Sequence, residues 1–155
     1  MKYRKAGRQD LAAVMALICD TIYTVYPRYY PQGCVDFFLD WHSPERVAAS
    51  IEAGQVNLLL DSGGRLVGTG SQEGNYISRV FVRPEYQGRG YGRMILDRLE
   101  AAVGEAWSAV RLDASLPAVR LYEHRGYRTV EHQSEETASG CVLVWDVMEK
   151  QLREG

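Results

Sequence analysis

The chain has few cysteines, few histidines and no excess of either charge. Its 155 residues include 3 cysteines and 3 histidines, and 18 basic side chains stand against 20 acidic ones. Balanced charge is not typical of a surface that binds nucleic acid, so we expect no nucleic-acid partner. The cysteines, Cys19, Cys34 and Cys141, are odd in number and far apart. This spacing argues against a disulfide framework and a zinc site, and we expect neither a disulfide nor a bound metal.

Long apolar runs are absent as well. No segment approaches the length of apolar sequence that spans a bilayer, and no apolar signal core follows the basic residues 1–5. We therefore expect a cytoplasmic location and no membrane partner. A length of 155 residues with 46% hydrophobic content fits one packed domain over residues 1–155.

Hydrophobic periodicity and turn residues predict a chain in which strands and helices are mixed. We expect strands at residues 2–5, 55–60, 66–72, 75–82, 108–114, 127–133 and 141–148, and helices at residues 8–25, 44–53, 91–103 and 117–125. The aromatic-rich segment after Pro27 receives no regular element in this prediction.

The most informative stretch is residues 80–92, which has the pattern of a strand, a glycine turn and the start of a helix. Residues 80–82 are strand formers, and Pro84 ends the strand because it has no backbone donor. The turn contains three glycines and two arginines, namely Gly88, Arg89, Gly90, Gly92 and Arg93. Glycines let the backbone turn tightly with its N–H groups exposed, and such groups at a helix start bind anions. The stretch therefore predicts a phosphate site.

A glycine turn after a strand also occurs in dinucleotide and nucleoside triphosphate sites. Here no Gly-Lys-Ser or Gly-Lys-Thr follows the turn, and no clear β-α-β unit with a distal acidic residue surrounds it. These absences disfavour both classes. A generic nucleotide-binding protein and a plain tight turn stay as alternatives.

The pattern Gln87-x-x-Gly90-x-Gly92, after a strand that ends in Val-x-Pro, resembles motif A of the GCN5-related N-acetyltransferases. Members of that family bind acetyl-coenzyme A (acetyl-CoA). The resemblance implies that backbone N–H groups of residues 88–92 hold the coenzyme pyrophosphate and that residues 80–82 bind the pantetheine arm. The implied cofactor site consists of Val80, Phe81, Val82, Gln87, Gly88, Arg89, Gly90, Tyr91, Gly92, Arg93 and Ser115. Among the arginines we favour Arg89 as the partner of a phosphate.

Residues 115–127 resemble motif B of the same family. The matching positions are Ala118, Leu121, Tyr122, Glu123 and Gly126, with Tyr127 in place of Phe and Ser115 in place of Asn. The Ser115 hydroxyl can partly substitute for the amide. The two motifs with their flanking strands cover most of the chain. The resemblance implies an α/β fold with a mostly antiparallel mixed sheet, splayed at the cofactor site and flanked by helices.

The resemblance also implies transfer of an acetyl group from acetyl-CoA, the cosubstrate, to a primary amine. Tyr122 is the expected general acid, because a phenol with a pKa of about 10 is close to an alkyl thiol. Its alternative role is that of a core aromatic residue. Glu73, just before the strand at 75–82, is the candidate general base, and Asp113, His42 or a water chain are alternatives.

The aromatic block at residues 23–41 corresponds to the family's variable acceptor region. Tyr29, Tyr30 and Trp41 are the candidate acceptor-binding residues, because aromatic faces attract cations; packing of helices onto the sheet is the alternative. The acceptor is expected to be an amine of a small molecule or peptide. Family members often form dimers, which makes a homodimer a candidate assembly. A non-catalytic acyl-CoA-binding sensor or regulatory module is the alternative function.

Overall fold

The computed structural model describes residues 1–153, and strands and helices alternate along them much as the periodicity predicts. The strands are β1 (Lys2–Lys5), β2 (Val56–Leu60), β3 (Leu66–Glu73), β4 (Tyr76–Val82), β5 (Ala109–Ser115), β6 (Arg128–Glu136) and β7 (Val142–Gln151). The helices are α1 (Leu11–Val25), α2 (Gln32–Trp41), α3 (Pro44–Glu52), α4 (Tyr91–Gly104) and α5 (Leu116–His124). Short 3-10 turns are η1 (Arg8–Asp10), η2 (Tyr26–Arg28) and η3 (Pro84–Tyr86).

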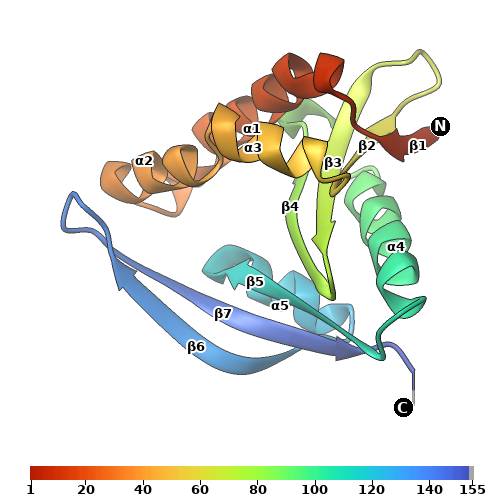
Figure 1. Ribbon diagram of the computed structural model, residues 1–155. Coiled ribbons are helices and arrows are strands. Elements are labelled where there is room, and N and C mark those ends of the chain that lie inside the picture. Colours follow the sequence, from red (N-terminus) through yellow and green to blue (C-terminus); the bar gives the residue numbers. More distant parts are fainter. Residues whose placement is uncertain (154–155) are drawn as a thin grey trace.

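The strands form one seven-stranded sheet in the order β1-β2-β3-β4-β5-β7-β6. All neighbours are antiparallel except β4 and β5, which are parallel and pair at a single register position, Tyr76 with Arg111. Beyond that point the two arms of the sheet diverge (Figure 1). The mixed, splayed sheet is therefore confirmed. Among the described residues, the edge of β4 that faces β5 has no strand partner over residues 77–82.

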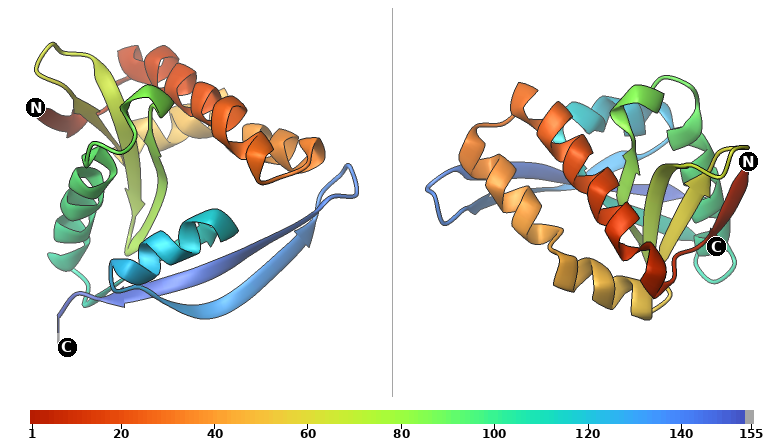
Figure 2. Two further views of the ribbon diagram at one scale, coloured as in Figure 1. Left: turned by 180° about the vertical axis from the view of Figure 1, so that it is seen from behind. Right: turned by 90° about the horizontal axis from the view of Figure 1, so that it is seen from above.

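Helices cover both faces of the sheet, with α1, α2 and α3 on one face and α4 and α5 on the other (Figure 2). α4 lies very close to β3, because the strand presents glycine there. A Cβ on Gly70 would come within 2.6 Å of Ile95 and 2.8 Å of Leu99. This close approach fixes the start of α4, and with it the glycine turn, beside the end of β4.

The stretch Arg8–Arg28, which contains α1, is long and apolar enough to cross a membrane by length and composition, with a mean hydropathy of 1.2. The expectation that no segment approaches this length is therefore wrong. In the structure α1 buries Val14, Leu17 and Ile18 against the sheet, as the core helix of a folded domain does.

α2 lies in the aromatic segment for which no element was predicted. Aromatic and β-branched side chains are weak helix formers, so local propensity gives little signal here. Packing stabilises the helix instead. Cys34 and Val35 are buried, and Phe38, one turn later, packs against the same core as Val35. Pro31 is the N-cap of α2, and its extended backbone precedes the first helical residue.

A disulfide joins Cys34 of α2 to Cys141, which precedes β7, with Cα atoms 5.9 Å apart. The expectation of no disulfide is therefore wrong. The two cysteines are 107 residues apart in sequence, and only the folding of α2 over the β6–β7 loop brings them together. Cys19 is free. Disulfides are rare in a reducing cytosol, and the cytoplasmic location stays a prediction.

Candidate active site

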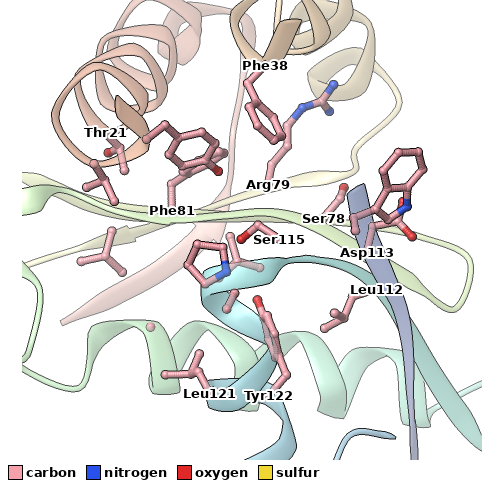
Figure 3. Close-up of a pocket in the computed structure, with 18 of the residues that line it drawn as sticks. Thr21, Phe38, Ser78, Arg79, Phe81, Leu112, Asp113, Ser115, Leu121 and Tyr122 are labelled. Atoms are coloured by element: carbon pink, nitrogen blue, oxygen red, sulfur yellow. The ribbon is translucent and has the colours of Figure 1, made fainter. Parts of the chain in front are cut away.

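A cavity of about 1150 Å³ opens where β4 and β5 separate (Figure 3). Its wall is built from α1 and α2, from β4 and the glycine turn, from β5 and α5, and from the β6–β7 pair. Ligand sites favour such places, where elements from distant parts of the chain converge. Most of the residues that the sequence singled out meet in this cavity.

A β-bulge interrupts β4 in the cavity wall. Gly70 of β3 stands opposite two residues of β4, Arg79 and Val80. Arg79 takes a φ of 49°, in the left-handed region that non-glycine residues rarely adopt. Beyond the bulge, residues 80–82 line the cavity and present the unpaired edge of β4. These are the residues predicted to bind a pantetheine arm.

The glycine turn lines another part of the cavity, where α4 begins. Gly88 and Gly90 have φ of 79° and 85°, and a Cβ on either would meet nothing within 4 Å. Open space thus lies beside a backbone whose first helical N–H groups have no partner within the helix. Of the predicted turn residues, the cavity is lined by Gln87, Gly88, Gly90, Tyr91, Gly92 and Arg93.

Arg89 is the exception in the turn. Its guanidinium lies 5.4 Å from the ring centroid of Tyr86, and Arg89 is not among the residues that line the cavity. Arg93, one turn into α4, does line it. Of the two arginines, only Arg93 lies in the cavity wall, and the role of Arg89 stays a prediction.

Tyr122 projects from α5 into the cavity (Figure 3). Its ring packs edge-on against Tyr127 at 5.4 Å, and the Tyr127 hydroxyl is anchored by donating to Glu100 at 2.9 Å. Burial raises the pKa of Tyr122 to about 12. The hydroxyl is therefore protonated at neutral pH and available as a proton donor.

Ser115, at the end of β5, and Tyr30, just before α2, lie close to each other in the cavity wall. The Ser115 hydroxyl makes no capping bond to α5 although it occupies the N-cap. The Tyr30 hydroxyl is buried near the Ser115 side chain and the Leu116 amide, without a hydrogen bond of good geometry to either. Burial raises the pKa of Tyr30, and Ser115 and the Leu116 amide limit the rise.

The three candidate bases occupy different places. Asp113 of β5 lines the cavity and accepts a hydrogen bond of 2.9 Å from the Tyr76 hydroxyl. His42 also lines it, but burial, followed by the charge of Arg79, lowers the pKa of His42 to about 3. Such an imidazole holds a proton too weakly to act as a base near neutral pH. Glu73 lies exposed at the end of β3 and does not line the cavity.

The aromatic candidates Tyr29, Tyr30 and Trp41 all line the cavity. Tyr29 and Trp41 are 58% and 51% exposed, so they stand at its mouth. Arg79 of β4 and Trp145 of β7 also line it, although neither was predicted from the sequence. The bulge inverts the alternation of β4, so that Ile77 and Phe81, four residues apart, pack into cores on opposite faces of the sheet. Because apolar residues are buried on both faces, the sequence shows no polar and apolar alternation that could mark this inversion at Arg79.

Comparison with known families agrees with this geometry. The family model described as an acetyltransferase (GNAT) domain matches residues 25–152. The chain belongs to the GNAT acetyltransferase family. The two motifs that resemble this family thus identified it, and the GNAT domain makes the chain an acetyltransferase. A comparison with curated protein sequences gives no match.

Solved structures of GNAT proteins share the fold over nearly the whole chain. The GCN5-related N-acetyltransferase from Rhodopseudomonas palustris is 25% identical, with a TM-score of 0.86 and coverage of 97% of this chain and 95% of that one. The PaiA N-acetyltransferase from Thermoplasma acidophilum, in complex with coenzyme A, is 17% identical, with a TM-score of 0.72 and coverage of 97% and 98%. YncA, a putative acetyltransferase from Salmonella typhimurium with its cofactor acetyl-CoA, is 20% identical, with a TM-score of 0.72 and coverage of 100% and 95%.

Proposed function

We propose that this GNAT protein transfers the acetyl group of acetyl-CoA to the primary amine of a small molecule or peptide. One observation carries the proposal: the unpaired edge of β4, the glycine turn and the Tyr122 hydroxyl converge on a single cavity. The residues fit acetyl-CoA. Residues 80–82 offer backbone groups to the pantetheine arm, and the start of α4 with Arg93 offers positive charge to the pyrophosphate.

Acetyl transfer forms a bond from the amine nitrogen to the thioester carbon and breaks the bond from that carbon to sulfur. Negative charge develops on the carbonyl oxygen, and a backbone N–H of residues 80–82 supports it. Tyr122 gives its proton to the departing sulfur. The burial that raises the pKa of Tyr122 also raises that of a thiol bound beside it, so the two stay matched.

The amine must lose a proton, and Asp113 is the base that we propose. It lines the cavity, and the hydrogen bond from Tyr76 fixes its carboxylate. Glu73, the candidate from sequence, lies outside the cavity and would have to act through water. A homodimer stays a prediction.

Replacement of Tyr122 by Phe tests the catalytic role. We expect kcat to fall by about 100-fold or more, with the KM for acetyl-CoA nearly unchanged, because only the proton donor is lost. Tyr127→Phe is the matched control, since that hydroxyl bonds Glu100 and Tyr127 is not among the cavity residues. It should lower stability and leave kcat within a few-fold.

An unchanged kcat in Tyr122→Phe would remove Tyr122 from the mechanism. Binding of acetyl-CoA without turnover of any amine would instead support a sensor that binds acyl-CoA.

A further inference from the structure

Arg79 is a charged residue in the cavity wall whose backbone is strained. It occupies the β4 bulge with a φ of 49°. Bulges re-aim side chains, and backbone strain at a non-glycine residue persists where the surroundings hold it in place. Arg79 rises from β4 toward α2 and α3, on the face opposite Tyr122 (Figure 3).

The partners of Arg79 are neutral. Its Nε donates to Nδ1 of His42 at 3.0 Å, and its Nη1 donates to the Ser50 hydroxyl at 2.9 Å. The low pKa of His42 keeps the imidazole uncharged. No carboxylate in residues 1–153 forms an ion pair with the guanidinium.

An unpaired cation in a partly desolvated place is costly. Burial, and then the nearby charge of Arg46, lowers the pKa of Arg79, while Glu73 opposes this. Buried charges are normally paired, and a guanidinium has five N–H donors, of which two are used here. The remaining donors have no hydrogen-bond partner among residues 1–153, and Arg79 is one of the residues that line the cavity.

The opposite charge stands on the other arm of the sheet. Asp113 of β5 and Glu135 of β6 line the same cavity. The other cavity arginines have separate places: Arg125 is paired with Asp97 and Glu100, and Arg93 lies at the glycine turn. The acceptor end of the cavity therefore has a cationic side at Arg79 and an anionic side at Asp113.

This arrangement is complementary to a molecule that carries both charges. We propose that Arg79 binds a carboxylate of the acceptor, so that the acceptor is an amino acid or another amine that bears a carboxylate. Its ammonium group lies toward Asp113. The inference rests on the proposed function. The aromatic wall beside Arg79, with Phe38 and Phe81, favours acceptors with an apolar side chain.

Matched acceptor pairs test the proposal in steady-state kinetics. Each pair consists of an amino acid and the amine that remains after its carboxylate is removed, for example phenylalanine and phenethylamine. The panel also includes the corresponding pairs for leucine, methionine and glycine. For the wild type we expect kcat/KM to favour the amino acid of at least one pair by about 10- to 100-fold. In Arg79→Met this preference should fall to within a few-fold.

Arg46→Met is the matched control. It removes the same charge from a residue that stacks on Trp41, at 4.5 Å, and does not line the cavity, so the preference should persist. Arg79→Lys should keep part of the preference, because a point charge remains without the fork of donors. Melting temperatures show whether each variant is folded.

A binding measurement separates this inference from the proposed function. Calorimetry with coenzyme A present compares each N-acetyl amino acid with the N-acetyl form of its decarboxylated amine, which requires no turnover. Tighter binding of the carboxylate form, lost in Arg79→Met and kept in Arg46→Met, supports the inference even if no acceptor is acetylated. Amine acetylation with no carboxylate preference in any pair, or equal binding of both forms throughout, would overturn it and leave the proposed function standing.

Discussion

The guanidinium Nε of Arg79 donates a hydrogen bond of 3.0 Å to Nδ1 of His42. This bond ties the β4 bulge to the segment between α2 and α3. Because Nδ1 accepts, the neutral imidazole carries its proton on Nε2. Phe81 packs edge-on against the same ring at 5.4 Å, so His42 is held on two sides.

His42 makes stability depend on pH. The unfolded imidazole takes up a proton below pH 6.5, whereas burial keeps the folded one neutral down to about pH 3. Its contribution to stability is therefore complete above pH 6.5 and is lost as the pH falls toward 3. Below pH 6.5 we expect the unfolding free energy to fall with acidification by up to about 1.4 kcal/mol per pH unit more in the wild type than in His42→Asn.

Urea unfolding at a series of pH values measures this difference, with the exposed His124→Asn as the control. Equal slopes for the wild type and His42→Asn would show that His42 is not buried in a neutral form.

The disulfide should stabilise the fold and hold α2 over the β6–β7 loop. It closes a segment of 107 residues, and loss of a disulfide typically costs about 2–4 kcal/mol. We expect Cys34→Ser with Cys141→Ser to lower the unfolding free energy by this amount. Reductant should lower the wild type to the same value and leave the double variant unchanged. Cys19→Ser is the control, and a wild type insensitive to reductant would contradict the pairing.

Arg93 should act on the phosphates of the donor. We expect Arg93→Gln to raise the KM for acetyl-CoA by about tenfold and to leave the KM for acetyl-pantetheine, which has no pyrophosphate, nearly unchanged. Arg89→Gln is the matched control, because its guanidinium lies over Tyr86 and it does not line the cavity. An equal effect of Arg93→Gln on both donors would place the pyrophosphate elsewhere.

Local sequence accounts for most of the helices and strands. It also accounts for the part of the cavity that we propose to bind acetyl-CoA, namely the glycine turn and the residues around Tyr122. Each of these segments has a characteristic residue spacing over a short stretch of chain, so it can be recognised in the sequence without knowledge of the fold. The prediction of a helix at residues 91–103 and the observed Tyr91–Gly104 differ by one residue.

The part of the cavity that we propose to bind the acceptor depends on contacts between distant segments of the chain. The Cys34–Cys141 bond joins segments that no spacing rule connects. Arg79 adopts a left-handed backbone conformation where one residue of β3 faces two residues of β4. No residue pattern in the sequence marks this position. The separation of the candidate bases has a similar cause. Glu73 is near β4 in sequence but lies outside the cavity, whereas Asp113 of β5 lines it.

Acetyl transfer to an amine can be measured by incubating the wild type with acetyl-CoA and a panel of polyamines, amino acids, aminoglycosides and peptides. Free thiol and acetylated amine are measured in the same samples. We expect thiol release that depends on an amine and equals the amount of acetylated amine formed. Thiol release that no amine raises above the rate with acetyl-CoA alone, in a protein that still binds acetyl-CoA, would contradict acetyl transfer to an amine.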